Sequence, residues 1–241
     1  MNKLDTTQFK KDLLELNISL SEEQINQFLE YYELLIEWNS IMNLTTITEF
    51  NEVITKHFID SLSLVKACDL SKDLKIIDIG TGAGFPGIPL KIAFPNLKIT
   101  LLDSVNKKLN FLNTVIEKLD LKDIVTLHGR AEDFATPDKL REKFDVCVSR
   151  AVATLSTLAE YCLPYVKIDG KFISYKSERI SEEHLQAKSA IFLLGGKVDE
   201  QIEFTLPSSD IYRNLFVIKK VTSTNKRYPR KAGLPGKEPL K

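Results

Sequence analysis

The sequence predicts an α/β fold: a mostly parallel sheet of seven strands with an antiparallel edge, preceded by a helical N-terminal subdomain. Three observations favour this fold. From Leu74 onward, short apolar runs alternate with amphipathic stretches, as in chains that form parallel sheets covered by helices. Near the C-terminus, two strand-like runs follow each other closely, as expected for an antiparallel edge pair. The chain before Leu74 shows helical spacing instead.

The N-terminal subdomain, predicted over residues 1–70, begins with clear helical signals. Ser21 and Gln24 have the spacing of a capping box, which starts many helices. Apolar residues then recur every three or four positions, at Ile25, Phe28, Leu29, Tyr32, Leu35 and Ile36. We expect a shorter helix before this one, over 9–16, and another after it, over 53–65.

The sheet domain is predicted over residues 71–221 and has a Rossmann-like alternation. Its expected strands are seven apolar runs, at 74–79, 99–102, 124–127, 146–149, 171–175, 198–204 and 214–221. Its expected helices lie between them, at 88–94, 105–119, 137–142, 154–166 and 181–194. The remaining segment, 222–241, forms a separate basic tail.

Composition bounds the class of protein. With 241 residues and 43% hydrophobic content, the chain can bury one substantial core. It has no run of about 18 apolar residues, so we expect neither secretion nor membrane spanning. Its cysteines form no paired motif and read as reduced thiols of a cytoplasmic protein: Cys68, Cys147 and Cys162. Its histidines are scattered, so we expect no metal: His57, His128 and His184.

Charge is unevenly distributed along the chain. From Lys219 to Lys241 there are eight Lys or Arg and one acid, a net charge of +7, so the preceding residues carry −7. A basic tail on an acidic body indicates a polyanionic partner.

A glycine-rich stretch follows the first predicted strand. Gly80, Gly82 and Gly84 allow the backbone to lie against a ligand where a Cβ atom would intrude. Asp103 ends the second strand, 23 residues after Gly80, where a carboxylate accepts hydrogen bonds from the hydroxyls of an adenosine ribose. The loop and the acid together predict a nucleoside cofactor.

Two kinds of cofactor fit these glycines. The frame Gly82-x-Gly84-x-x-Gly87 matches the dinucleotide pattern, so an NAD(P)-dependent oxidoreductase is one alternative. Asp78, however, places a negative charge beside the turn, which favours a cationic ligand over a pyrophosphate. With the acid on the second strand, the loop resembles that of class I S-adenosylmethionine-dependent methyltransferases. The resemblance implies that the glycine turn approaches the methionine part and that Asp103 takes the ribose.

Residues after the third and fourth strands are further candidates. Ala131 and Glu132 follow strand three, where backbone amides and an acid can read an adenine edge. Arg150 follows strand four, where an arginine often meets a carboxylate or phosphate, and we expect it to position a ligand.

The sequence offers no obvious catalytic base or nucleophile. The segment 149–152 lacks the (Asn/Asp)-Pro-Pro-(Tyr/Phe) motif of adenine amino methylation. Methylation at carbon 5 of a pyrimidine requires a cysteine nucleophile, but Cys147 lies within a predicted strand and is expected to be a core thiol. Methylation of guanine N7 requires neither this motif nor a cysteine nucleophile, because N7 carries a lone pair and no proton. The missing groups are therefore compatible with an N7 target, and no catalytic residue is assigned.

The basic tail contains the predicted RNA contacts. Its cations neutralise phosphates and Tyr228 is able to stack on an unpaired base. The set is Lys226, Arg227, Tyr228, Arg230 and Lys231. Composition alone predicts a mobile tail, whereas the fixed prolines and glycines favour a defined path.

The whole chain resembles the bacterial family of small-subunit ribosomal RNA methyltransferase G, also called glucose-inhibited division protein B. The matching segments are 38–39 with 43–45, 57–62, 78–89, 102–104 with 107–108, 149–151 and 227–233. The resemblance implies N7 methylation of one guanine in the decoding-region loop of 16S rRNA, within the small ribosomal subunit, with S-adenosylmethionine as cofactor. It implies cofactor contacts at Gly80, Phe85, Ala131, Glu132 and Arg150. We expect a monomer; a non-catalytic ribosome-associated RNA-binding protein is the other alternative.

Overall fold

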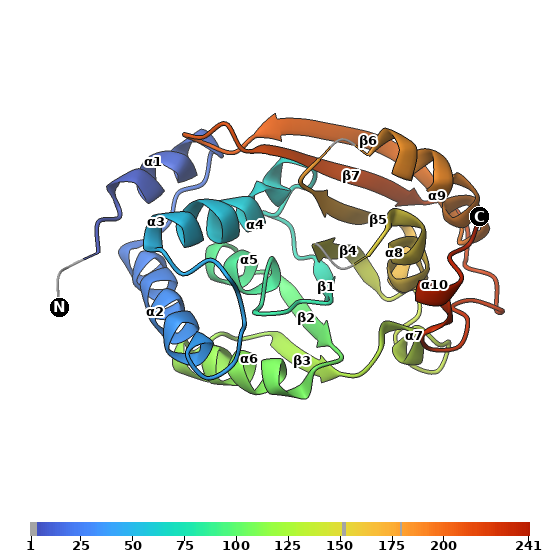
Figure 1. Ribbon diagram of the computed structural model, residues 1–241, viewed down its shortest axis with the longest axis horizontal. Coiled ribbons are helices and arrows are strands. Elements are labelled where there is room, and N and C mark those ends of the chain that lie inside the picture. The colour runs from blue at the N-terminus through green and yellow to red at the C-terminus, as the bar shows by residue number, and fades with distance from the viewer. Residues whose placement is uncertain (1–3, 151–152, 179) are drawn as a thin grey trace.

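The computed structural model describes residues 4–150, 153–178 and 180–241 and contains one seven-stranded sheet (Figure 1). The strand order is β3-β2-β1-β4-β5-β7-β6. Strands β1 to β5 pair in parallel, whereas β7 runs antiparallel to both β5 and β6. The strands are β1 Lys75–Ile79, β2 Lys98–Asp103, β3 Ile124–His128, β4 Phe144–Arg150, β5 Val166–Lys176, β6 Gly196–Thr205 and β7 Tyr212–Lys220. The predicted sheet, with its antiparallel edge, is confirmed.

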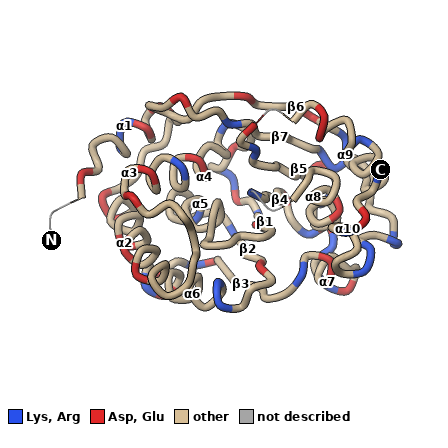
Figure 2. Tube along the Cα trace, in the orientation of Figure 1, with Lys and Arg blue, Asp and Glu red and all other residues tan. Residues whose placement is uncertain are grey.

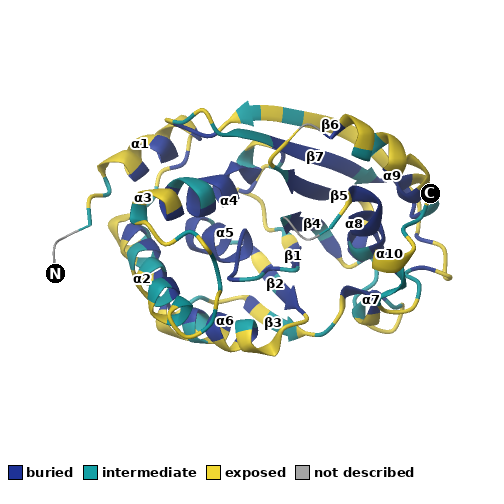
Figure 3. Cartoon of the chain, viewed as in Figure 1, coloured by how far each residue is buried: buried dark blue, intermediate teal, exposed yellow. Residues whose placement is uncertain are grey.

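Helices cover the two faces of this sheet, and each face has its own apolar core (Figures 1 and 3). The first core joins the sheet to α1 Thr7–Glu15, α2 Glu22–Asn39, α3 Phe50–Val53, η1 Ile54–Ile59, α4 Asp60–Leu62, η2 Ser63–Lys66, α5 Gly87–Ala93 and α6 Asn106–Lys118. The second joins it to α7 Ala131–Phe134, α8 Leu155–Cys162, η3 Leu163–Tyr165 and α9 Ser181–Leu193. The short helix α10, Leu234–Lys237, contacts α8.

The N-terminal helices pack directly on the sheet domain. The predicted capping box is present: the Ser21 hydroxyl accepts from the Gln24 amide at 3.2 Å, and the Gln24 side chain accepts from the Ser21 amide at 2.9 Å. Phe28 of α2 packs on Phe58 of η1, with ring centroids 5.0 Å apart. Both rings belong to the same core as the residues of α5 and α6. The boundary between 1–70 and 71–221 stays a prediction, but the two parts share one core.

The predicted helix over 137–142 is wrong, because this segment forms turns and the helix lies earlier, at α7. Long-range bonds hold the segment in place. Glu142 has a φ of 52°, outside the helical region, and its amide donates to the carbonyl of Pro164. The Arg141 guanidinium donates to backbone carbonyls of the tail, at Thr224 and Tyr228.

The C-terminal tail follows a defined path along the protein, as its prolines and glycines favoured. It lies beside α7 and α8, where the chain ends in red in Figure 1. Lys220, which is fully buried, donates from Nζ to the Leu163 carbonyl at 2.7 Å and also to the Thr224 hydroxyl. Burial lowers the pKa of Lys220 to about 8. The tail is therefore anchored in the protein at its first residues.

Candidate functional site

A cavity of about 870 Å³ opens beyond the carboxyl ends of the parallel strands. The last residues of three neighbouring strands line it: Ile79 of β1, Asp103 of β2 and Arg150 of β4. This is the edge at which open parallel sheets bind ligands, and the volume suits a cofactor-sized molecule.

The glycine loop forms the cavity wall between β1 and α5. Gly84 has a φ of 99°, and a Cβ atom there would lie 2.8 Å from the Tyr31 hydroxyl, so only glycine fits. Gly82 has nothing within 4 Å of its Cβ position, and it lines the cavity together with Gly80. Gly84, which the sequence predicted as a cofactor contact, faces side chains of α2, α5 and α6 and is not among the lining residues.

Asp78 lies underneath the loop and does not line the cavity. One carboxylate oxygen accepts from the Thr81 hydroxyl at 2.7 Å and from the Gly87 amide at 3.0 Å. The side chain is fully buried, and burial raises its pKa to about 6. Asp78 thus fixes the shape of the loop, whereas the sequence had suggested a charge placed beside the ligand.

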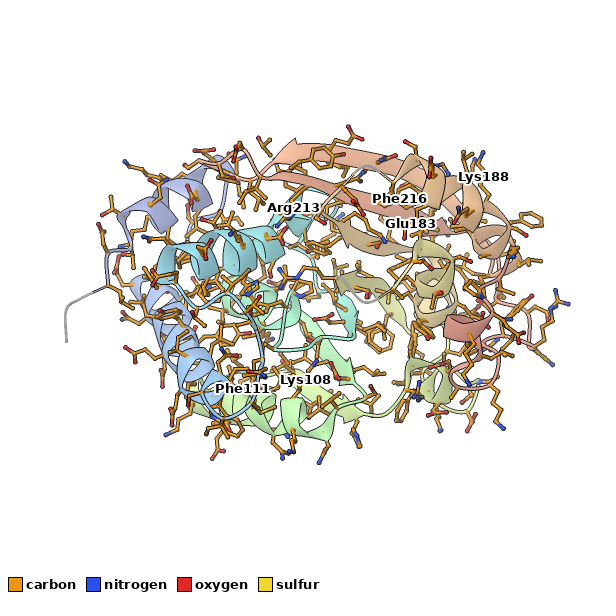
Figure 4. The ribbon with its side chains drawn as sticks, viewed as in Figure 1. Lys108, Phe111, Glu183, Lys188, Arg213 and Phe216 are labelled. Atoms are coloured by element: carbon orange, nitrogen blue, oxygen red, sulfur yellow. The ribbon has the colours of Figure 1, made fainter. Side chains whose placement is uncertain are left out.

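Asp103 lines the cavity at the end of β2, where the sequence placed it. Its two oxygens accept from the backbone amides of Gly82 and Val105, each at 2.9 Å. Lys108, labelled on α6 in Figure 4, brings its ammonium group to 3.9 Å from the carboxylate. Because each carboxylate oxygen has a further lone pair, Asp103 can still accept hydrogen bonds from a ligand.

Ala131 and Glu132 line the cavity at the start of α7. The Ala131 carbonyl accepts from the Tyr165 hydroxyl at 2.5 Å, which fixes the backbone there. One oxygen of Glu132 accepts from the amide of Gly233 in the tail at 2.7 Å. The sequence predicted Glu132 as a cofactor residue but gave no sign of this contact.

Arg150 reaches from β4 to the N-terminal helices. Its guanidinium pairs with Asp60 at 3.1 Å, donates to the Lys56 carbonyl at 3.2 Å and lies 5.1 Å from the centre of the Phe85 ring. Arg213, which approaches α4 from β7, binds the other oxygen of Asp60 at 2.9 Å (Figure 4). One buried carboxylate thus holds two guanidinium groups, which leaves an excess of positive charge beside the cavity.

His57 is a site residue to which sequence reasoning assigned no role. It lines the cavity from η1, a π-helical segment of the kind often found at functional sites. Its ring stacks on Phe85 with centroids 4.4 Å apart, and Nε2 lies 2.9 Å from the Thr45 hydroxyl. Burial, followed by the nearby Arg150, lowers the pKa of His57 to about 4, so the ring is neutral at pH 7. The one signal in the sequence was that His57 begins segment 57–62, one of the segments that resemble the methyltransferase G family.

The predicted RNA residues divide into two groups. Tyr228 is 5% exposed and packs in the second core, and the Arg230 guanidinium pairs with the fully buried Glu160, so both are engaged in the fold. The other three side chains are exposed: Lys226, Arg227 and Lys231. Blue segments at the right edge of Figure 2 mark basic residues of this part of the tail. The predicted RNA contacts remain predictions.

The described residues include neither a metal-binding cluster nor a membrane-spanning helix. Within 4–150, 153–178 and 180–241, no group of three or more His, Cys, Asp or Glu is placed to hold a metal ion. In the same ranges no helix has the length and apolar character that a membrane span requires. Ala151 and Val152, which stand where the adenine-methylation motif would be, lie outside the described residues.

Comparison with solved structures identifies the fold. A chain of the complex between the Haloferax volcanii Trm112 methyltransferase activator and the putative methyltransferase matches 71% of this chain and 93% of its own length, with a TM-score of 0.56 and 14% identity. A SAM dependent methyltransferase from Aquifex aeolicus matches 72% of this chain and 94% of its own length, with a TM-score of 0.52 and 18% identity. The sheet is that of class I methyltransferases.

Comparison of sequences identifies the family. The family model described as rRNA small subunit methyltransferase G, GidB, matches residues 24–212. A protein named ribosomal RNA small subunit methyltransferase G in Lachnoclostridium phytofermentans is 55% identical over 236 residues, 98% of each chain. One of the same name in Bacillus cytotoxicus is 48% identical over 237 residues, 98% of this chain and 99% of its own. With these matches over nearly its whole length, the chain belongs to the rRNA small subunit methyltransferase G family.

Proposed function

We propose that this protein is a cytoplasmic S-adenosylmethionine-dependent methyltransferase that acts on N7 of one guanine in the decoding-region loop of 16S rRNA. The observation that carries the proposal is the cavity at the strand ends, where the glycine loop and the Asp103 carboxylate meet. S-adenosylmethionine, when bound, supplies an electrophilic methyl group. The predicted monomeric state remains a prediction.

The residues of the cavity fit this cofactor. At Gly82 the space that a Cβ atom would enter is open, so the loop offers bare backbone to a ligand. Asp103 retains acceptor capacity for the two hydroxyls of a ribose. Gly80, Phe85, Ala131, Glu132 and Arg150, which the family resemblance assigns to the cofactor, all line the same cavity.

The dinucleotide alternative conflicts with the bond made by the Gly87 amide at the start of α5. A pyrophosphate in a G-x-G-x-x-G site accepts from the first amides of the helix. Here the Gly87 amide donates to the Asp78 carboxylate at 3.0 Å. An anion would therefore meet a buried acid rather than free amides.

A second group of lining residues is suited to the acceptor base. It comes from the N-terminal region and consists of Leu44, Thr45 and His57. The Asn39 side chain holds this loop by accepting from the amides of Leu44 and Thr45, at 2.8 and 2.9 Å. A neutral imidazole gives a purine base a flat surface on which to stack.

Guanine N7 requires no proton removal, which agrees with the side chains present. His57 is the residue of this group whose side chain could act as a general base. Burial and the nearby Arg150 keep its ring neutral, and its Nε2 is hydrogen-bonded to the Thr45 hydroxyl. We assign it a positioning role, not that of a general base. Asp78 is fully buried beneath the glycine loop and does not line the cavity. The chain's task is therefore alignment of the base and exclusion of water.

The test is methyl transfer to rRNA. Purified protein with radiolabelled S-adenosylmethionine is incubated with small subunits, and separately with naked 16S rRNA, from a strain that lacks this enzyme. We expect label in one guanine, located by reduction, aniline cleavage and reverse-transcription stops. An Asp103→Ala variant that retains RNA association without labelling would support catalysis over the alternative of a non-catalytic RNA-binding protein. No label, in the presence of an active control methyltransferase, would refute the proposal.

A further inference from the structure

The last part of the tail, residues 228–240, lies beside the cavity and contributes Gly236 and Pro239 to its lining; we refer to it as the C-terminal strap. Arg230 binds both oxygens of Glu160 on α8, with Nε at 3.0 Å and Nη2 at 2.7 Å. The Gly233 amide donates to Glu132 on α7 at 2.7 Å. The strap thus bridges two helices that follow different strands of the sheet.

Two further bonds hold the strap against α8. The Thr157 hydroxyl donates to the carbonyl of Pro235 at 3.2 Å, and the Ser156 hydroxyl donates to the carbonyl of Leu240. Arg230 also donates to the carbonyl of Glu238 at 2.7 Å, which ties the strap to itself. Because Glu160 is fully buried, its charge would be left unpaired if the strap detached.

The strap supplies part of the cavity wall. Gly236 and Pro239 line the cavity with Ala131 and Glu132 of α7 and with Tyr161 of α8. A Cβ atom at Gly236 would lie 3.3 Å from the Tyr161 hydroxyl, so a larger side chain there crowds Tyr161 at the cavity wall. Neither Gly236 nor Pro239 carries a charge, and both are small residues.

We infer that the C-terminal strap is a component of the cofactor site and forms the wall against the adenine base. This inference rests on the proposed function, because it takes S-adenosylmethionine as the ligand. Asp103 on β2 takes the ribose. The adenine base then lies against β3, the next strand of the sheet, and against α7, which follows β3 along the chain. Glu132 lies at this position and also holds the strap through Gly233, so one carboxylate connects the wall to the base-binding segment.

The inference is tested by binding of S-adenosylhomocysteine to the full-length protein, measured by calorimetry. In Gly236→Leu, the added side chain competes with the base, and we expect affinity to fall at least tenfold with little change in the midpoint of thermal unfolding. Lys237→Leu is the matched control, since it places the same side chain one position later, at an exposed residue outside the cavity. It should bind as the wild type does.

Hydrogen exchange of the wild-type protein provides a second readout that requires no substitution. Saturating S-adenosylhomocysteine should slow exchange at the strap amides, including those of Gly233, Leu234 and Glu238, which are hydrogen-bonded in the structure. Wild-type affinity in Gly236→Leu, or strap exchange that the ligand leaves unchanged, would overturn the inference while leaving the proposed function intact. A wild-type protein that does not bind S-adenosylhomocysteine at all would instead refute the proposed function, and the strap's role with it.

Discussion

Tyr31 on α2 donates a hydrogen bond from its hydroxyl to the carbonyl oxygen of Ala83, at 2.5 Å, in the middle of the glycine loop. Its ring is fully buried and stacks on Phe58 with centroids 5.5 Å apart. Burial raises the pKa of Tyr31 well above its usual value of 10, so the hydroxyl remains a donor at any physiological pH. The N-terminal helices therefore support the loop that faces the cavity.

Tyr31→Phe should destabilise the protein through this loop. The substitution leaves the buried Ala83 carbonyl without its donor, which costs about 1–3 kcal/mol of unfolding free energy. Tyr32→Phe is the matched control, because the Tyr32 hydroxyl bonds to Thr48 at an exposed position, and its loss should cost less than about 1 kcal/mol. Urea unfolding measures both. Equal effects of the two substitutions would contradict a special role for the loop contact.

The sequence was sufficient to predict the parts of the site that depend on local pattern. A buried strand, a glycine turn and a helix are adjacent along the chain, and parallel strands necessarily end at the same edge. Asp103 and Arg150 were therefore placed correctly at that edge, although nothing local fixed their partners. The same reasoning misplaced the helix after β3, because the turns at 137–142 are held by bonds to distant segments, at Pro164 and in the tail.

Contacts between distant segments were beyond such reasoning. Glu132 and Gly233 are 101 positions apart, and Glu160 and Arg230 are 70 apart. No periodicity or spacing links residues at these separations, so Arg230 read only as another cation of a basic tail. Asp78 illustrates a different limit: its position beside the glycines was evident, but its burial under them depends on how α5 packs.

Asp103 should be essential for cofactor affinity. Asp103→Ala removes the acceptor of two backbone amides and the expected partner of the ribose. Since hydrogen bonds to charged groups contribute about 1.5–3 kcal/mol, affinity for S-adenosylhomocysteine should fall by roughly tenfold to more than a hundredfold. Asp103→Asn, which retains one acceptor oxygen, should lose less. Calorimetry distinguishes the variants, and unchanged binding in Asp103→Ala would exclude a role at the ribose.

His57 should make stability dependent on pH on the acid side. Its pKa is about 4 in the folded protein and 6.5 ordinarily, so the unfolded chain binds the extra proton between these values. Its contribution to stability is complete above pH 6.5 and is lost as the pH falls towards 4, at up to about 1.4 kcal/mol per unit.

The measurement is the free energy of unfolding at pH 7.5 and pH 5.0. Between these values the wild type should lose about 2 kcal/mol that His57→Gln does not lose. His128→Gln, which removes an exposed histidine, should behave as the wild type. If His57→Gln retains the full pH dependence of the wild type, another group must be responsible for it.

The exposed cations of the tail should contribute to RNA binding without affecting the cofactor. Replacing Lys226, Arg227 and Lys231 together with Gln removes three positive charges that make no ion pair among the described residues. Affinity for small-subunit rRNA should fall, and the slope of log affinity against log salt should decrease by up to about three, in proportion to the phosphates no longer neutralised. S-adenosylhomocysteine affinity should be unchanged.

Arg230→Gln is the informative contrast. Because this guanidinium holds the strap to Glu160, its loss should weaken cofactor binding, whereas the loss of a residue that contacts only RNA would leave cofactor binding unchanged. Filter binding over a range of salt concentrations, together with calorimetry, separates the two effects, and an unaltered salt slope in the triple variant would remove these residues from the RNA interface.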